Sequence, residues 1–437
     1  MNNYKTLSTI DILAIGFMTF SFFLGAGNII FPPLAGLLAG EQIVPAAFGF
    51  LLTAVGLPLL GILSVSIAGN NWQGVTCYLP PWVSTTMAVL IFIVIGPAFA
   101  EPRTGLVAYE MAIKPLLGEH SSLLIFSILF FSTSLYFSWA SGKLIDYIGK
   151  ILTPTLFITL IILGVSVFLY PQSPILAAQS IYINAPFTTG FLEGYNTMDT
   201  FAALMFGMLL IDIIKKKGIS DKKLLSRYLV IAGIIAAVGL AFVYLSLFYL
   251  GATSSSLIHN VDNGGTILAI YVQALFGPVG QYILSIIVLL ACLTTSIGLT
   301  SAFADYMSTI SKISYRIWVI LVSISCMLVA NIGLAQLISL SIPVLYTLYP
   351  MTICLVFLTF IRKFIRAPKK IYRNILIITL LFSLLDAAKV IGITPKFCHL
   401  IPFFDDGLAW VLPALITLAL SLLFYRKDVQ QVAHPQH

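Results

Sequence analysis

Backbone that leaves the helical pattern inside an apolar stretch is the first chemically informative feature of this chain. The segment Gly25-Ala26-Gly27-Asn28 interrupts the apolar residues 10–36, and Phe31-Pro32-Pro33 follows it at once. Hydrocarbon offers no water to free N–H and C=O groups, so unwound backbone at membrane depth is tolerated only where protein or a cavity partner satisfies it. The break therefore indicates a binding site for a solute or an ion.

A second polar segment, from Glu193 to Thr200, precedes the apolar residues that begin at Phe201. One interpretation is a second break within a membrane span. The other is an ordinary loop before a shorter span, with Asn196 or Thr197 as the N-cap and Asp199 in the first turn. The first break and the internal symmetry described below favour the paired-break interpretation.

Small hydroxyl residues in an otherwise aliphatic stretch form the third feature. Ala291, Thr294 and Thr295 are spaced by three and four residues, so they share one face of a helix. Hydroxyl and carbonyl oxygens are the ligands that hard cations prefer, and Na⁺ accepts such a neutral set. The alternative is that these hydroxyls bond to carbonyls of their own helix or join neighbouring helices.

The elements that position these residues are membrane helices. Of 437 residues, 59% are hydrophobic and 9% are charged, whereas roughly a quarter of the residues of a soluble domain are charged. A span needs about 20 apolar residues, and twelve stretches meet that length. They cover residues 10–36, 43–67, 84–113, 121–141, 151–170, 194–214, 227–250, 279–306, 314–333, 336–361, 373–391 and 407–425. The sequence therefore predicts an all-α integral membrane protein.

The basic residues are distributed unevenly between the connecting loops. Segments 171–192 and 251–278 contain no Lys or Arg. Nearly all the basic residues lie on the other side: Lys5, Lys143, Lys150, Lys215, Lys216, Lys217, Lys222, Lys223, Arg227, Lys312, Arg316, Arg362, Lys363, Arg366, Lys369, Lys370, Arg373, Arg426 and Lys427. Cytoplasmic loops carry this excess, so both termini are predicted to be cytoplasmic. The net charge of +7 thus reports topology and contact with the bilayer, without a nucleic-acid partner.

Enzyme signatures are missing from the sequence. We find no phosphate-binding Gly-x-x-x-x-Gly-Lys, no Gly-x-Ser-x-Gly and no His-Glu-x-x-His. The five cysteines stand singly, without Cys-x-x-Cys spacing. We therefore expect no catalytic residues and no cofactor. A channel or an intramembrane enzyme lacks support, because neither charged pore rings nor a catalytic constellation is present.

Internal symmetry organises the predicted spans. Many secondary transporters contain two inverted repeats whose first helices are both discontinuous. Here five spans in residues 1–170 form one repeat and five in 171–361 form the second, leaving two further spans in 362–437. Five spans per repeat place the two copies in opposite orientations. Spans one and six are then the discontinuous helices.

Five motifs give the chain a family resemblance. They are Gly16-Phe17-Met18-Thr19-Phe20, Gly25 to Pro33, Gly96 to Thr104, Glu193 to Asp199 and Thr294 to Leu299. Together, over essentially the whole chain, they resemble the bacterial branched-chain amino acid carrier family. The resemblance implies cation-coupled uptake, usually with Na⁺, of leucine, isoleucine and valine across the cytoplasmic membrane. It also implies the five-plus-five inverted-repeat architecture of amino acid and sodium symporters.

The resemblance implies a Na⁺ site on the first and eighth spans. Its ligands are the backbone carbonyls of Ser21, Leu24 and Ala291 and the hydroxyls of Thr294 and Thr295. This set contains the helical face identified above from spacing. A proton-coupled symporter, or one for another small solute on the same scaffold, remains the alternative; Glu101 or Asp199 would then carry the proton. The oligomeric state stays open.

A zwitterionic amino acid needs three kinds of partner. The N–H groups of Ala26, Gly27 and Asn28 begin a half-helix whose positive end suits the carboxylate. Free carbonyls near Phe23, and others in the second break, suit the ammonium group. An apolar wall that includes Phe22 and Tyr195 suits the side chain. The candidate substrate-binding residues are Phe23, Gly25, Ala26, Gly27, Asn28, Gly194, Tyr195, Asn196 and Thr197.

Charged residues inside two spans require partners of their own. Glu101 and Arg103 in the third span are interpreted first as a structural or gating pair, in a helix bent by Pro97 and Pro102, and second as a proton relay. Asp386 and Lys389, three residues apart in the eleventh span, are interpreted as a neutralising pair.

Overall fold

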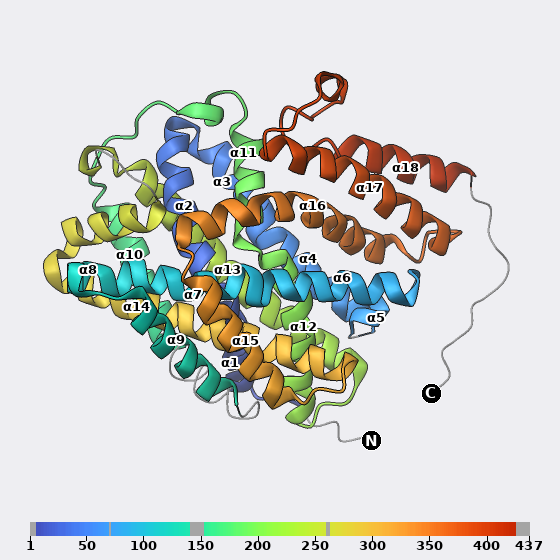
Figure 1. Ribbon diagram of the computed structural model, residues 1–437, viewed down its shortest axis with the longest axis horizontal. Coiled ribbons are helices and arrows are strands. Elements are labelled where there is room, and N and C mark those ends of the chain that lie inside the picture. Colours follow the sequence, from blue (N-terminus) through green and yellow to red (C-terminus); the bar gives the residue numbers. More distant parts are fainter. Residues whose placement is uncertain (1–5, 70, 140–152, 259–262, 425–437) are drawn as a thin grey trace.

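The computed structural model describes residues 6–69, 71–139, 153–258 and 263–424, and every regular element in these ranges is helical. The longer helices pack side by side in several directions around a common core (Figure 1). The all-α fold expected from composition is therefore present. Five of the basic residues predicted to be cytoplasmic lie outside the described residues: Lys5, Lys143, Lys150, Arg426 and Lys427.

Eighteen α-helices make up the described parts of the chain. They are α1 (Thr9–Phe23), α2 (Ala26–Ala39), α3 (Ile43–Leu51), α4 (Leu57–Ile67), α5 (Trp72–Val75), α6 (Pro81–Ile93), α7 (Ala100–Ala108), α8 (Lys114–Leu117), α9 (Leu123–Ser138), α10 (Thr153–Leu169), α11 (Pro186–Glu193), α12 (Asp199–Lys216), α13 (Lys222–Ala252), α14 (Gly264–Ile310), α15 (Tyr315–Ala330), α16 (Leu334–Ile361), α17 (Pro368–Val390) and α18 (Val411–Phe424). Each of the twelve predicted apolar stretches falls on one of these helices or on two consecutive ones. The positions of the apolar helices were thus predictable from hydropathy alone.

Six continuous helical runs in the described ranges are long and apolar enough to cross a membrane. They are Ala26–Ile67, Pro81–Leu117, Lys222–Ala252, Gly264–Ile310, Leu334–Ile361 and Pro368–Val390. A seventh arises if the bent pair Pro186–Thr197 and Asp199–Lys216 is one span. Shorter apolar helices account for the rest of the predicted stretches. The count of twelve crossings stays a prediction.

Proline and glycine interrupt two of the long runs, and the first of these bends, at Pro97, was expected from the sequence. Between α6 and α7, Gly96 leaves the helical region (φ −89°, ψ −119°) immediately before Pro97. Gly277, with φ +62°, similarly kinks α14 before Pro278. Proline lacks the N–H of the helical ladder and crowds the preceding turn, so both kinks have a local cause.

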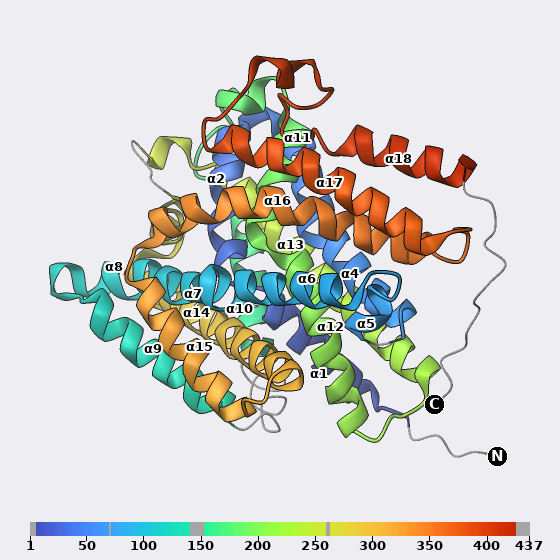
Figure 2. The same ribbon diagram turned by 45° about the vertical axis from the view of Figure 1, so that its right-hand side comes forward.

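Helix α13 lies at the centre of the molecule and contacts α1, α2, α4 and α10. Both views show α16, α17 and α18 together on one side, with α9 and α15 on the opposite side (Figures 1 and 2). The apolar side chains between these helices form one continuous core. The N-terminal break and the start of α12 are buried within it.

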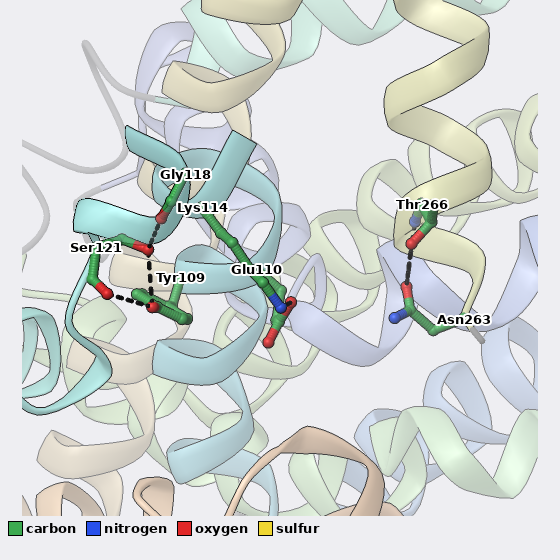
Figure 3. Close-up of polar contacts among 7 residues, drawn as sticks. All are labelled: Tyr109, Glu110, Lys114, Gly118, Ser121, Asn263 and Thr266. Carbon is green, nitrogen blue, oxygen red and sulfur yellow. Dashed lines mark hydrogen bonds and ion pairs between the residues drawn. The ribbon is translucent and has the colours of Figure 1, made fainter. Parts of the chain in front are cut away.

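Local polar contacts fix the ends of two helical runs (Figure 3). The hydroxyl of Tyr109 lies 2.9 Å from Oγ of Ser121, which donates a 2.7 Å hydrogen bond to the carbonyl of Gly118. Asn263 caps α14 by accepting a 3.1 Å hydrogen bond from the N–H of Thr266. These contacts hold the turn before α9 and the start of α14 in place.

Asp386 and Lys389 form no direct ion pair, although their charges still interact. The ammonium group of Lys389 instead donates to the carbonyls of Phe404 and Asp405. Asp386 accepts a 3.3 Å hydrogen bond from the backbone N–H of Ala409. The loop after α17 folds back and supplies these partners, which helix spacing alone does not reveal.

Candidate functional site

The first predicted break lies between α1 and α2. Helix α1 ends at Phe23, and α2 begins at Ala26. The N–H of Gly25 donates to the carbonyl of Phe23 (2.7 Å) and to Oδ1 of Asn28 (3.2 Å). The first N–H groups of α2 have no carbonyl of a preceding turn to bond, so they remain available for a ligand.

The second predicted break lies between α11 and α12. Gly194–Thr197 form a single 3₁₀ turn, and Met198 adopts a left-handed conformation (φ +62°, ψ +14°) before α12 begins. The two helical parts are bent by 43°. A residue with a Cβ is strained in this conformation, and the complete burial of Met198 holds it there. The polar segment is thus a buried turn within the helix bundle.

One hydrogen-bonded triangle joins the two breaks. The side-chain amide of Asn28 donates a 2.6 Å hydrogen bond to Oδ2 of Asp199 and a second hydrogen bond to the hydroxyl of Tyr244. That hydroxyl donates to the same Oδ2 at 2.8 Å. All three side chains are buried. The start of α2 and the start of α12 are therefore tied together through α13.

A small cavity lies beside this triangle, and in this conformation it must widen to admit an amino acid. The residues that line it are Phe22, Phe23, Gly25, Ala26, Gly27, Asn28, Ile95, Ala100, Arg103, Thr104, Thr197, Met198, Asp199, Ala202, Phe206, Thr295 and Leu299. The polar groups come from both breaks, from α7 and from Thr295 of α14. Aliphatic and aromatic side chains complete the wall, so the cavity has separate surfaces for charged and apolar groups.

Aromatic rings dominate the apolar wall of the cavity. Phe206 of α12 stacks on Phe22 with 5.1 Å between centroids and meets Phe23 edge-on at 5.6 Å. Ile95 and Leu299 add aliphatic surface. Phe22 and Phe23 thus line the cavity as expected, and Phe206 is the aromatic residue that sequence reasoning missed.

The five candidate cation ligands lie together between α1 and α14. Oγ1 of Thr295 is 3.3 Å from the carbonyl oxygens of both Ser21 and Leu24. The hydroxyl of Ser21 lies 3.1 Å from that of Thr294, which donates to the carbonyl of Ala291 at 3.0 Å. Carbonyl and hydroxyl oxygens from two helices converge, as a hard cation requires. The same contacts also fit hydroxyls that only join helices, so cation binding stays a prediction.

The candidate substrate-binding residues divide into two groups. Phe23, Thr197 and the segment 25–28 line the cavity. Gly194, Tyr195 and Asn196 are not among the lining residues.

The three residues outside the lining have other neighbours. Gly194 packs closely against Thr53, and Tyr195 stacks on Tyr349 with 4.3 Å between ring centroids. The amide of Asn196 donates to Oε2 of Glu193 at 3.0 Å. The backbone carbonyl of Asn196 nevertheless lies close to the start of α2.

Arg103 is the most informative residue that sequence reasoning placed wrongly. It was expected to pair with Glu101, but Glu101 accepts hydrogen bonds from Thr300 (2.5 Å) and Ser296 (3.5 Å) of α14. Arg103 is 3% exposed and lines the cavity instead. Positions two apart on a helix do not face each other. An arginine in an apolar span is itself a signal of function, and here it marks the cavity.

Comparison with known proteins agrees with these features. The family model for branched-chain amino acid transport proteins matches residues 8–428. The chain is 44% identical over 422 residues to the branched-chain amino acid transport system 2 carrier protein of Pseudomonas aeruginosa, covering 95% of this chain and 96% of the relative. It is 40% identical to the branched-chain amino acid permease BrnQ of Escherichia coli K12, covering 98% of each chain.

Solved structures show the same fold at low sequence identity. A Na⁺-coupled sialic acid symporter in a substrate-bound, outward-open state matches with a TM-score of 0.61, at 14% identity and with 96% of this chain and 91% of that chain covered. MhsT in complex with L-phenylalanine matches with a TM-score of 0.55, at 15% identity and with 97% and 99% covered. These likenesses place the helices in a known transporter architecture.

The sequence relatives are named as carriers and permeases, which agrees with the absence of enzyme signatures, and the protein is a transporter rather than an enzyme. The match of the family model to residues 8–428 covers all the described helices and both breaks. The chain belongs to the branched-chain amino acid transport protein family.

Proposed function

We propose that this protein is a Na⁺-coupled symporter that takes up leucine, isoleucine and valine across the bacterial cytoplasmic membrane by alternating access. The relatives named above are branched-chain amino acid carriers and permeases, and one fold neighbour is a Na⁺-coupled symporter. The observation that carries the proposal is the convergence of Thr295 with the carbonyls of Ser21 and Leu24, directly beside the cavity.

The proposed architecture has twelve spans arranged as two inverted repeats of five and two additional helices. Residues 1–170, 171–361 and 362–437 form the three parts, with spans one and six discontinuous. Two observations support this arrangement. Helix α1 ends at Phe23 just before α2 begins at Ala26, and the chain bends by 43° before Asp199. Discontinuous helices place free backbone groups at mid-membrane depth, which a transported zwitterion requires.

The proposed substrate pose uses the two kinds of surface in the cavity. The N–H groups of Ala26 and Gly27 at the start of α2 attract the carboxylate. Phe22, Phe23 and Phe206 surround the aliphatic side chain. One methylene in such a pocket changes binding by only about 1–3 kcal/mol, so leucine, isoleucine and valine are all accepted.

Na⁺ is the proposed coupling ion, bound by the carbonyls of Ser21, Leu24 and Ala291 and the hydroxyls of Thr294 and Thr295. No other cofactor is invoked. Proton coupling is the second candidate, and the buried carboxylates Glu101 and Asp199 favour it. The two candidates differ in which gradient drives uptake.

Uptake of radiolabelled leucine into proteoliposomes tests the proposal, with inward Na⁺ and H⁺ gradients imposed separately. We expect uptake to follow the Na⁺ gradient and excess isoleucine or valine to inhibit it. Uptake that follows only the H⁺ gradient would show that the coupling ion is H⁺ and not Na⁺. Leucine uptake that excess isoleucine and valine leave unchanged would contradict the shared pocket.

A further inference from the structure

We propose that Arg103 and Asp199 are the charged groups that recognise the carboxylate and the ammonium of a free amino acid. This inference rests on the proposed function, because it concerns the same cavity, and it assigns substrate recognition to two side chains instead of backbone groups alone. It makes the transporter selective for zwitterions, whichever ion drives transport.

The position of Arg103 fits a carboxylate bound at the start of α2. A Cβ atom added to Gly27 would lie 3.0 Å from Nη2 of Arg103, so the guanidinium lies directly over the first turn of α2. It also lies over the ring of Phe31, 5.4 Å from the centroid. A carboxylate at this point meets the positive helix end and a planar cationic fork together.

The guanidinium of Arg103 forms no direct ion pair within the described residues, although it interacts electrostatically with Asp199. Its Nε has no hydrogen-bond partner within the described residues, although the residue is 3% exposed. Buried charges are otherwise paired or hydrogen-bonded, because desolvation is costly. Glu101, the nearest acid in the sequence, instead accepts hydrogen bonds from Ser296 and Thr300 of α14. A substrate carboxylate supplies the missing acceptor.

Asp199 is held in position for a cation on the cavity side. Asn28 and Tyr244 both donate to its Oδ2, which fixes the carboxylate while it lines the cavity. A preorganised carboxylate loses little freedom when it binds an ammonium group, and charge-assisted hydrogen bonds are the strong ones. Asn28 and Tyr244 are then positioning residues for Asp199.

The charges of the cavity complement those of a zwitterion. Arg103 and Asp199 are the charged residues among those that line it, and their formal charges cancel. A neutral zwitterion adds one acceptor and one donor, so each buried charge gains an opposite partner. A monoamine or a monocarboxylate satisfies one residue and leaves the other unpaired. Ligands that carry both groups are therefore preferred.

Competition against binding of radiolabelled leucine to the purified protein tests this pairing. The competitors are leucine, 3-methylbutylamine, which lacks the carboxylate, and 4-methylpentanoate, which lacks the ammonium. For the wild-type protein we expect each analogue to bind at least about 30-fold more weakly than leucine, as loss of one buried charge partner predicts. Analogues that bind as tightly as leucine would overturn the proposal.

Substitutions assign the two groups to the two residues. Arg103→Gln should weaken leucine about 30-fold or more while leaving 3-methylbutylamine binding unchanged. Asp199→Asn should weaken leucine and 3-methylbutylamine but not 4-methylpentanoate. Arg316→Gln, at an exposed site, and Asp212→Asn, at a half-exposed one, are the matched controls. Equal loss of all three ligands in either variant, or unchanged leucine binding in both, would contradict the assignment.

Thermal stabilisation keeps the proposal testable in two further cases. If the variants fail to fold, the wild-type analogue panel, read as a shift in melting temperature, still decides whether both groups are required. If the wild-type protein does not bind leucine, the same measurement is made with each of the twenty amino acids. Stabilisation by another amino acid, but not by its decarboxylated analogue, supports the pairing and refutes only the proposed substrate; stabilisation by none refutes both.

Discussion

Thr295 lies where the cavity, the end of α1 and Gly25 meet. It lines the cavity, contacts the end of α1, and faces Gly25, where an added Cβ would lie 3.0 Å from its methyl group. The absence of a side chain at Gly25 therefore favours the close approach of α1 and α14. A cation bound here would share its shell with the residues that hold the substrate, which provides a direct route for coupling.

Removing the two candidate hydroxyl ligands should weaken the cation dependence of transport. In Thr294→Ala/Thr295→Ala, the Na⁺ concentration for half-maximal leucine uptake should rise about tenfold or more, because two of five ligand oxygens are lost. The measurement is uptake in proteoliposomes at several Na⁺ concentrations, normalised to the amount of inserted protein. Thr133→Ala is the control, since Thr133 is exposed on α9 and donates only to Leu129 of its own helix. An unchanged Na⁺ response would indicate that both threonines only join neighbouring helices.

Glu101 and Arg103 show how two neighbouring charges acquire different environments. Glu101 is fully buried and bonds to Thr300 and Ser296, and Ser296 contacts Ser134 of α9 at 2.9 Å. It thus links α7, α9 and α14. Arg103 faces the cavity two positions later. The helical rotation of about 200° over two residues sends the two side chains in different directions.

Among the elements, α2 and α13 pack closely enough to exclude side chains. A Cβ at Gly36 would lie 2.0 Å from the carbonyl oxygen of Phe248, and one at Gly251 would lie 1.9 Å from that of Pro33. Small residues allow this backbone contact, which is common between membrane helices. The contact fixes α2, and therefore the N–H groups that begin it, against the central helix.

Filling this contact should destabilise the protein without touching the cavity. Gly36→Ala and Gly251→Ala should each lower the free energy of unfolding by about 1–3 kcal/mol, the usual cost of overpacking. Thermal unfolding in detergent measures the change. Gly56→Ala is the matched control, because the nearest atom to its added Cβ is 3.5 Å away. If the Gly36 and Gly251 variants had the same melting temperature as the control, the proposed role of this contact in holding α2 would be wrong.

At the scale of the whole molecule, segments assigned to one side of the membrane contact one another. On the predicted cytoplasmic side, Lys217 pairs with Asp11 at 2.6 Å, and Arg362 donates to the carbonyl of Ile67. On the predicted external side, the hydroxyls of Ser173 and Ser256 lie 2.5 Å apart. Loops on opposite faces cannot meet in this way, so the contacts agree with the predicted grouping of these segments by side, while the choice of the cytoplasmic side stays a prediction.

Cysteine labelling tests the orientation directly. Cys77 is exposed, whereas the other four cysteines are buried, and it lies in the loop after α5 that cytoplasmic termini place inside the cell. A membrane-impermeant maleimide should therefore label inside-out vesicles and spare intact cells. Cys77→Ser should abolish labelling, and Ala177→Cys in that background, at an exposed external position, should be labelled in intact cells. The reverse pattern would invert the predicted topology.

Much of the fold was readable along the chain because each signal is local. Apolar length located the helices, and the residues Gly25 to Asn28 and Glu193 to Thr200 marked both interruptions. The face shared by Ala291, Thr294 and Thr295 followed from helical spacing. The contacts of α14 with α1 then placed all three residues beside the first break.

The sequence by itself determined a helical membrane protein with two polar interruptions and a hydroxyl-bearing face, because hydrocarbon imposes apolar length and makes unwound backbone conspicuous. Only the tertiary structure decided that Arg103 faces the cavity, that Asn28 holds Asp199, and that Tyr195 packs against Tyr349. Those outcomes depend on the rotation and crossing of helices far apart in the chain. Such packing is fixed by close contacts between side chains, which no spacing along a single helix records.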